Sequence, residues 1–112
     1  MRAIDLDNLD LASARRAIEK AREEKPWCTR EKKDPNSYKV IARKKFVGKR
    51  ETEPHFVTFI LGTAGRFAIC TCTGTLYNAE RGKICYGIAR AYEQHKRNME
   101  RDAKRAQEVK AA

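Results

Sequence analysis

The sequence contains no apolar run that approaches the roughly 18 residues of a membrane-spanning helix. Its first residues, 1–11, include three aspartates and lack the basic and then apolar pattern of a signal peptide. There is also no glycine-rich phosphate loop, no internal repeat and no convincing pair of nucleophile and base. We therefore expect an intracellular, cytoplasmic protein, with the nucleoid or nucleus as alternatives, that binds no membrane and is not an enzyme.

The chain is short, with 112 residues, and it has 4 cysteines and 2 histidines. This length corresponds to one small domain, which buries a moderate core and gains from a staple such as a metal ion. In a reducing compartment, closely spaced cysteines favour metal or redox chemistry over structural disulfides. The cysteines are therefore candidates for a metal or redox site.

Periodicity predicts an α+β domain with an N-terminal helix, a three-stranded antiparallel sheet and a long C-terminal helix. Apolar residues recur at helical spacing over 10–24 and again from Ile84 onward. Alternating or β-branched segments predict strands over 38–47, 55–62 and 67–72, the last two forming a hairpin.

We divide the chain into an N-terminal helix and loop, residues 1–37, and a ββα core with a C-terminal helical extension, residues 38–112, within one globular unit. Two prolines and their turn-forming neighbours predict a loop over 25–37. Trp27 is the single tryptophan, and we expect it to fill a gap beneath this loop.

Three cysteines have a spacing that suits a metal site. Cys70 and Cys72 stand at positions i and i+2 of a predicted strand, so both side chains face the same way. Cys85 follows after a loop at the start of the predicted helix, where the helix N-terminus favours the thiolate that binds zinc. Zinc prefers four ligands in a tetrahedron, so these three sulfurs require one more donor.

This arrangement resembles the SWIM zinc finger, in which Cys-x-Cys, a loop and then Cys-x-His lie on a ββα framework. Cys70-Thr71-Cys72 matches the first pair and Cys85-Tyr86 begins the second, over a resemblance that covers roughly residues 38–95. The family's histidine corresponds to Gly87, which offers no ligand. The resemblance implies a zinc-binding module with a role in DNA binding or protein–protein interaction.

Three explanations of the fourth position stay open. Another side chain completes the site, water or a partner's side chain does so, or the metal has been lost and the cysteines are core residues. Among side chains we favour Cys28 over His55. Cys28 lies in a predicted loop, which can bring it close to the other cysteines, whereas the sequence does not show at which end of the sheet the strand of His55 begins. His95 lies about 15 Å along the helix from Cys85, too far to share its metal.

Positive charge is concentrated in the middle of a chain whose net charge is +10: residues 30–50 hold nine basic and two acidic residues. Such a stretch attracts a polyanion, of which nucleic acid is the commonest. We expect Tyr38 and Phe46, which flank it, to be core residues. The candidate nucleic-acid-binding residues are Lys39, Arg43, Lys44, Lys45, Lys49, Arg50, Arg81 and Lys83.

The favoured function is therefore a small basic SWIM-like zinc module that binds nucleic acid. The alternative is a protein-interaction factor, an inhibitor or adaptor of a larger complex such as a phage or mobile element encodes. In that case the first or last helix carries the contact with another protein.

Overall fold

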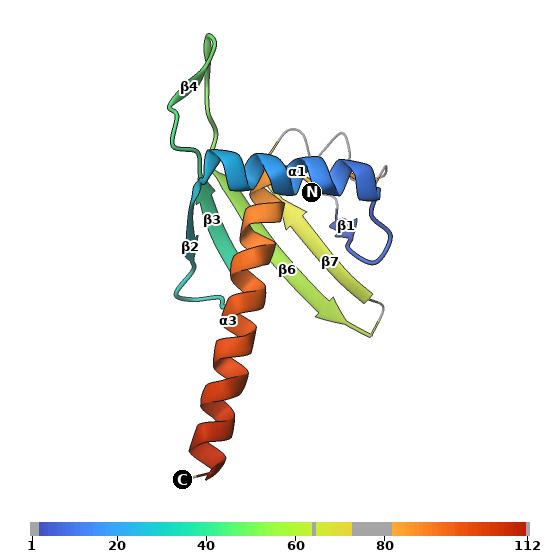
Figure 1. Ribbon diagram of the computed structural model, residues 1–112, viewed down its shortest axis with the longest axis vertical. Coiled ribbons are helices and arrows are strands. Elements are labelled where there is room, and N and C mark those ends of the chain that lie inside the picture. The colour runs from blue at the N-terminus through green and yellow to red at the C-terminus, as the bar shows by residue number, and fades with distance from the viewer. Residues whose placement is uncertain (1–2, 64, 73–81, 112) are drawn as a thin grey trace.

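The computed structural model describes residues 3–63, 65–72 and 82–111, which form an α+β domain with two helices (Figure 1). The helices are α1 (Leu11–Glu24) and α3 (Tyr86–Ala111). The strands are β1 (Ala3–Asp5), β2 (Trp27–Arg30), β3 (Ser37–Ile41), β4 (Phe46–Val47), β5 (Arg50–Glu51), β6 (His55–Gly62) and β7 (Gly65–Cys70). None of the described helices is long and apolar enough to cross a membrane.

Five strands form one antiparallel sheet in the order β1-β7-β6-β3-β2. The expected hairpin of β6 and β7 lies at its centre, and Gly62 pairs with Gly65 at the turn. Strands β4 and β5 form a separate two-stranded hairpin that projects away from the sheet (Figure 1).

The prediction of a three-stranded sheet is wrong, because it omitted the two short edge strands β1 and β2. Strand β1 has three residues, and only Ile4 among them is buried, so it carries no visible alternation. Strand β2 has four residues and lies between Pro26 and the Asp34-Pro35 turn, which favoured a loop. The predicted strand 38–47 also divides into β3 and β4.

Both edge strands belong to residues 1–37, which we had separated from the core as a helix and loop. Strand β1 pairs with β7 and β2 pairs with β3. The segment 1–37 therefore supplies both edges of the same sheet.

The side chains of the sheet alternate between two faces. On the inner face, Val40, Val57 and Cys70 are buried against Ile88 and neighbouring residues of α3. On the outer face the intervening side chains are exposed or half-buried. This period of two is the ordinary consequence of strand geometry when helices cover one side of a sheet.

Helix α1 packs against the beginning of α3 (Figure 1). Asp10 caps its N-terminus by accepting a hydrogen bond from the Ser13 backbone N–H. Lys25 ends it in a left-handed conformation, and Pro26 follows. Its buried stripe consists of alanines, two of which pack with Ala89 of α3, so the two helices approach closely.

Candidate metal centre

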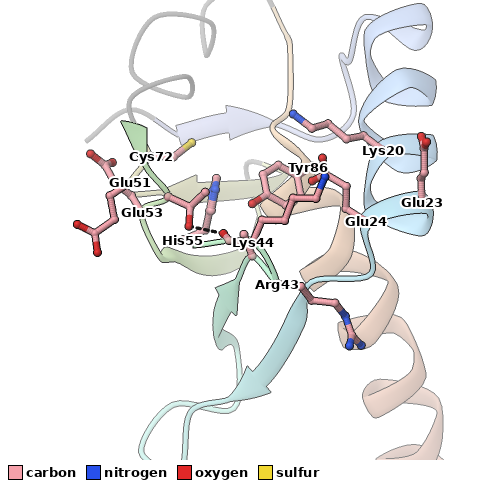
Figure 2. A pocket seen from close by; sticks show the side chains of 12 residues that line it. Lys20, Glu23, Glu24, Arg43, Lys44, Glu51, Glu53, His55, Cys72 and Tyr86 are labelled. Atoms are coloured by element: carbon pink, nitrogen blue, oxygen red, sulfur yellow. Dashed lines mark hydrogen bonds between the residues drawn. The ribbon is translucent and has the colours of Figure 1, made fainter. Parts of the chain in front are cut away.

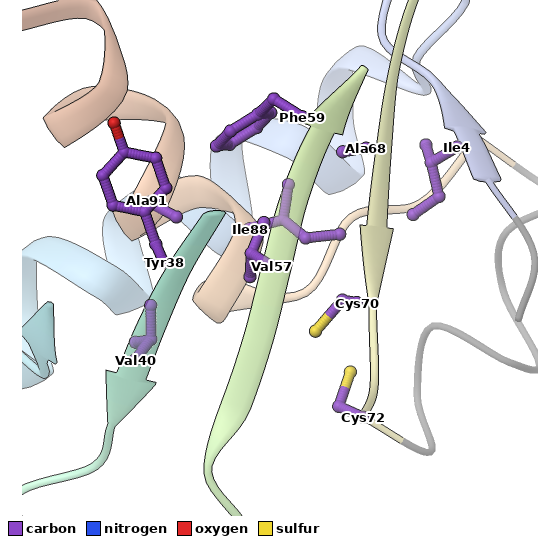
Figure 3. Close-up of a cluster of buried hydrophobic side chains, with 10 residues drawn as sticks. All are labelled: Ile4, Tyr38, Val40, Val57, Phe59, Ala68, Cys70, Cys72, Ile88 and Ala91. Atoms are coloured by element: carbon purple, nitrogen blue, oxygen red, sulfur yellow. The ribbon is translucent and has the colours of Figure 1, made fainter. Parts of the chain in front are cut away.

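The β6–β7 hairpin brings a histidine and two cysteines to one end of the inner face. Val57 pairs with Cys70, so His55, two residues before Val57, is level with Cys72, two residues after Cys70. The sulfurs of Cys70 and Cys72 lie on the same side of β7 (Figure 3). Strand alternation therefore directs all three side chains toward the helices.

Cys85 reaches this end of the sheet from the start of α3. Its backbone carbonyl accepts a hydrogen bond from Ala89 and its sulfur accepts one from the Ile88 N–H, at 3.4 Å. Just upstream, Gly82 accepts a hydrogen bond from the Asp10 N–H at 3.0 Å, which ties this segment to the start of α1. The beginning of α1 thus holds the entry to α3 in place.

Four donor atoms converge at this point. They belong to His55, Cys70, Cys72 and Cys85, which we call the Cys3His cluster. These four atoms all lie within 4.8 Å of one another, and the first three residues are buried while Cys85 is half-buried. The cluster is compatible with a metal site.

Gly87, which stands where the SWIM pattern has a histidine, lies against the ring of His55. A Cβ atom at position 87 would lie 2.6 Å from both Cγ and Nδ1 of His55, closer than real Cβ contacts allow. On another side the ring of Tyr86 meets the His55 ring edge-on, with centroids 4.9 Å apart. The ring of His55 therefore occupies the space that a side chain at position 87 would need.

The electrostatics of the cluster favour positive charge among the sulfurs. Burial alone would lower the pKa of His55, but hydrogen bonds to Cys72 and Cys85 raise it to about 9. Hydrogen bonds to the same two cysteines, together with burial, raise the pKa of Cys70 well above its ordinary value. A bound cation would stabilise neighbouring thiolates, which otherwise repel one another.

A cleft of about 1120 Å³ lies beside the cluster, with His55, Cys72 and Tyr86 in its lining (Figure 2). Its walls carry charges of both signs from α1 and from the segment around the β4–β5 hairpin. The charged residues are Lys20, Glu23, Glu24, Arg43, Lys44, Glu51 and Glu53. This mixture gives the cleft no strong preference for an anion or a cation.

Cys28, the fourth ligand favoured from the sequence, does not lie in the Cys3His cluster. It sits on β2, level with Val40 of β3, which is in turn level with His55 of β6. One whole strand therefore separates Cys28 from His55, a spacing of roughly 10 Å across the sheet. Cys28 packs against the core, and burial raises the pKa of its thiol.

His95 also lies away from the cluster, as its position along the helix indicated. Its Nδ1 atom is 2.8 Å from the Tyr38 hydroxyl, which also accepts a hydrogen bond from the Asn98 side chain at 3.2 Å. Its ring stacks on Phe59 with centroids 4.8 Å apart. His95 and Tyr38 are therefore buried core residues, as is Asn98.

The basic candidates divide between the sheet and the projecting hairpin. Lys39 lies on the outer face of β3, whereas Lys44, Lys45 and Lys49 are exposed in and around the β4–β5 hairpin. Arg43 follows β3 and contacts the ring of Trp27.

Three basic candidates remain, Lys83, Arg81 and Arg50. Lys83 is half-buried before α3. Arg81 lies outside the described residues, and the side chain of Arg50 in β5 is likewise not among those described.

Two aromatic predictions are wrong. Trp27 and Phe46, expected in the interior, are each 53% exposed. Trp27 begins the edge strand β2 with its side chain on the outer face, and Phe46 lies in the β4–β5 hairpin, which no helix covers.

The register of the β6–β7 hairpin is the signal that could have identified His55. The strands predicted over 55–62 and 67–72 leave a four-residue turn at 63–66, whereas Gly62 and Gly65 pair directly. That difference shifts the pairing by two residues, and so it hid the alignment of His55 with Cys72.

Comparisons of the chain with family models, with curated proteins and with solved structures give no match. The chemistry of the Cys3His cluster and of the surfaces around it therefore carries the functional proposal.

Proposed function

We propose that the chain is a zinc-stabilised module that binds nucleic acid and catalyses no reaction. The observation that carries the proposal is the convergence of one imidazole and three thiol groups where the sheet meets the start of α3. Zinc held there would join the β6–β7 hairpin to the start of α3, which lies further along the chain.

The spacing of the donor atoms suits zinc. In a tetrahedral site with zinc–sulfur bonds of about 2.3 Å and a zinc–nitrogen bond of about 2.0 Å, two sulfurs lie about 3.8 Å apart and sulfur lies about 3.5 Å from nitrogen. The sulfurs of Cys70 and Cys85 are 3.7 Å apart, and Nδ1 of His55 is 3.4 and 3.6 Å from them. Thiolates and imidazole are also the donors that zinc prefers over oxygen.

In this proposal His55 replaces the histidine that the SWIM resemblance expects at position 87. The donor set of that family is then preserved, although its histidine comes from a strand instead of the helix. The close approach between His55 and the backbone of Gly87 supports this exchange, because any larger residue at position 87 would displace the ring.

Four protein ligands leave no coordination position for water or substrate. Catalytic zinc sites keep such a position open, whereas Cys3His sites are typically structural. The proposed role of the metal is therefore to hold the fold together.

Charge supports nucleic acid as the ligand. The chain has a net charge of +10, and Lys44, Lys45 and Lys49 are exposed around a hairpin that projects into solvent. Exposed lysines on a projecting hairpin suit contacts to phosphate, which position a protein on nucleic acid.

Metal analysis of the purified chain, combined with nucleic-acid binding at two salt concentrations, tests this proposal. We expect about one zinc ion per chain, its loss in Cys85→Ala, and binding that weakens steeply as salt rises. A folded protein without metal would overturn the zinc assignment. Absence of binding at low salt, together with tight one-to-one binding to a single protein, would favour the protein-interaction alternative.

A further inference from the structure

Within residues 3–63, 65–72 and 82–111, no helix covers the outer face of the five-stranded sheet, which carries large apolar side chains. The helices lie on the other side (Figure 1), and four apolar residues of this face are about half exposed. They are Trp27, Ile41, Phe56 and Ile60. Phe67 and Ile69 of β7 continue the same surface at half-buried positions.

Cations accompany the two exposed rings of this face. The ammonium group of Lys39, which is level with Phe56 across β3 and β6, lies 5.6 Å from the centre of that ring. The guanidinium carbon of Arg43 lies 5.0 Å from the centre of the Trp27 ring. Each ring therefore has a positive charge beside it at a distance typical of a cation–π contact.

Acidic side chains are absent from the described outward positions of β2, β3, β6 and β7. Carboxylates lie at the margins of this surface. Asp34 accepts a hydrogen bond from the Ser37 hydroxyl at 2.7 Å, the exposed Glu31 follows β2, and Asp5, in the edge strand β1, is level with Phe67. The outward residues of the four strands are Trp27, Thr29, Ser37, Lys39, Ile41, Phe56, Thr58, Ile60, Gly62, Gly65, Phe67 and Ile69. The charge of this surface is thus positive at its centre.

Exposed aromatic rings interleaved with cations suit single-stranded nucleic acid. Each unpaired base offers a flat face that stacks on an aromatic ring, and its phosphate pairs with a neighbouring cation. In a duplex the base faces are already stacked on one another, so the rings would have no partner. Trp27 and Phe56 stand two strands and two residues apart, roughly 12 Å, so they would contact different bases.

We propose that the outer face binds single-stranded DNA or RNA, with Trp27 and Phe56 stacking on bases and with Lys39 and Arg43 contacting phosphates. This inference deepens the proposed function and rests on it. It assigns the rings and the exposed sheet surface a role in base contact, whereas the lysines of the β4–β5 hairpin add charge.

Fluorescence anisotropy with labelled dT20, rU20 and a 20-base-pair duplex tests the inference on the full chain. We expect tighter binding of the single strands than of the duplex. Phe56→Ala and Trp27→Ala should each weaken single-strand binding about tenfold, because removing one stacking ring removes the contribution of one base. Lys39→Gln and Arg43→Gln should each reduce the salt slope by about one ion.

Phe46→Ala provides a matched control. Phe46 has the same exposed fraction as Trp27, 53%, and Lys45 lies 5.7 Å from its ring centre, yet it belongs to the separate β4–β5 hairpin. We expect this variant to bind the single strands within about twofold of the wild type. Because Trp27 is the single tryptophan, its emission reports the same event, and dT20 should quench it in the wild type and in Phe46→Ala.

The outcomes separate this inference from the proposed function. If no nucleic acid binds, both fail. If single strands and duplex bind equally and the Phe56 and Trp27 variants bind like the wild type, the proposed function stands and the outer-face inference is wrong. Dimerisation of the wild type that Phe56→Ala abolishes, without any loss of single-strand binding, would instead assign the face to a second copy of the chain.

Discussion

The two faces of the central sheet differ although the same strands build both. On β6 the inward residues His55, Val57 and Phe59 are buried beneath the helices. The outward residues Phe56 and Ile60 of the same strand are about half exposed. The inner face carries the Cys3His cluster and the core, and the outer face carries aromatic rings and cations. If the outer face binds nucleic acid as proposed, stability and recognition can be altered separately in one strand, at alternate positions.

The largest effect should come from the inner face, at the Cys3His cluster. Cys70→Ser should abolish metal binding and the cooperative unfolding transition, because structural zinc contributes on the order of 10 kcal/mol to the folding of small domains. Metal analysis and thermal melting followed by circular dichroism would measure both.

Cys28→Ser is the matched control for that change, since Cys28 is a free cysteine on the same face but outside the cluster. We expect it to retain zinc and to unfold cooperatively. Loss of the metal in Cys28→Ser would contradict the assignment of His55 as the fourth ligand.

Two phenylalanines of β6 test the difference between the faces at constant chemistry. Phe59 is 3% exposed and Phe56 is 44% exposed. Phe59→Ala should lower the free energy of unfolding by about 3–5 kcal/mol, whereas Phe56→Ala should cost less than about 1 kcal/mol. Denaturant titration of the two variants would measure this, and equal losses would mean that the outer face is covered in solution.

The packing of His55 against the helix start should be sensitive to a single methyl group. Gly87→Ala should destabilise the protein by about 1–3 kcal/mol and weaken metal binding, because the added Cβ displaces the ring. Gly62→Ala in β6 is the control, since nothing lies within 4 Å of a Cβ there. Denaturant melts and competition with a chelator would compare them; equal effects at both glycines would be inconsistent with the close approach.

The smallest effect concerns a surface ion pair at the rim of the sheet. Asp7 accepts hydrogen bonds from Arg66, at 2.8 Å and 3.0 Å, and these hold the pKa of the carboxyl below its usual value of 3.8. A depressed folded-state pKa stabilises the protein above the unfolded value, and this contribution is lost as the pH falls through the folded value. Asp7→Asn should slightly lower the melting temperature at neutral pH and have no effect in strong acid, as paired melts would reveal.

Local signals in the sequence were sufficient to predict the two helices, the β6–β7 hairpin and the three clustered cysteines. The edge strands were missed because β1 and β2 are short and their pairing depends on distant partners. His55 was undervalued for a related reason: its role depends on the hairpin register, which a two-residue error in the turn conceals. Trp27 was misplaced because a large apolar side chain suggests burial, whereas its position on an edge strand exposes it.

X-ray absorption at the zinc edge of the purified protein tests the central claim most directly, because it identifies the atoms around the metal. We predict three sulfurs at about 2.3 Å and one nitrogen at about 2.0 Å, with an imidazole signal that disappears in His55→Ala and persists in His95→Ala. A shell of four sulfurs would show that Cys28 completes the site, and a shell without imidazole would contradict the role proposed for His55.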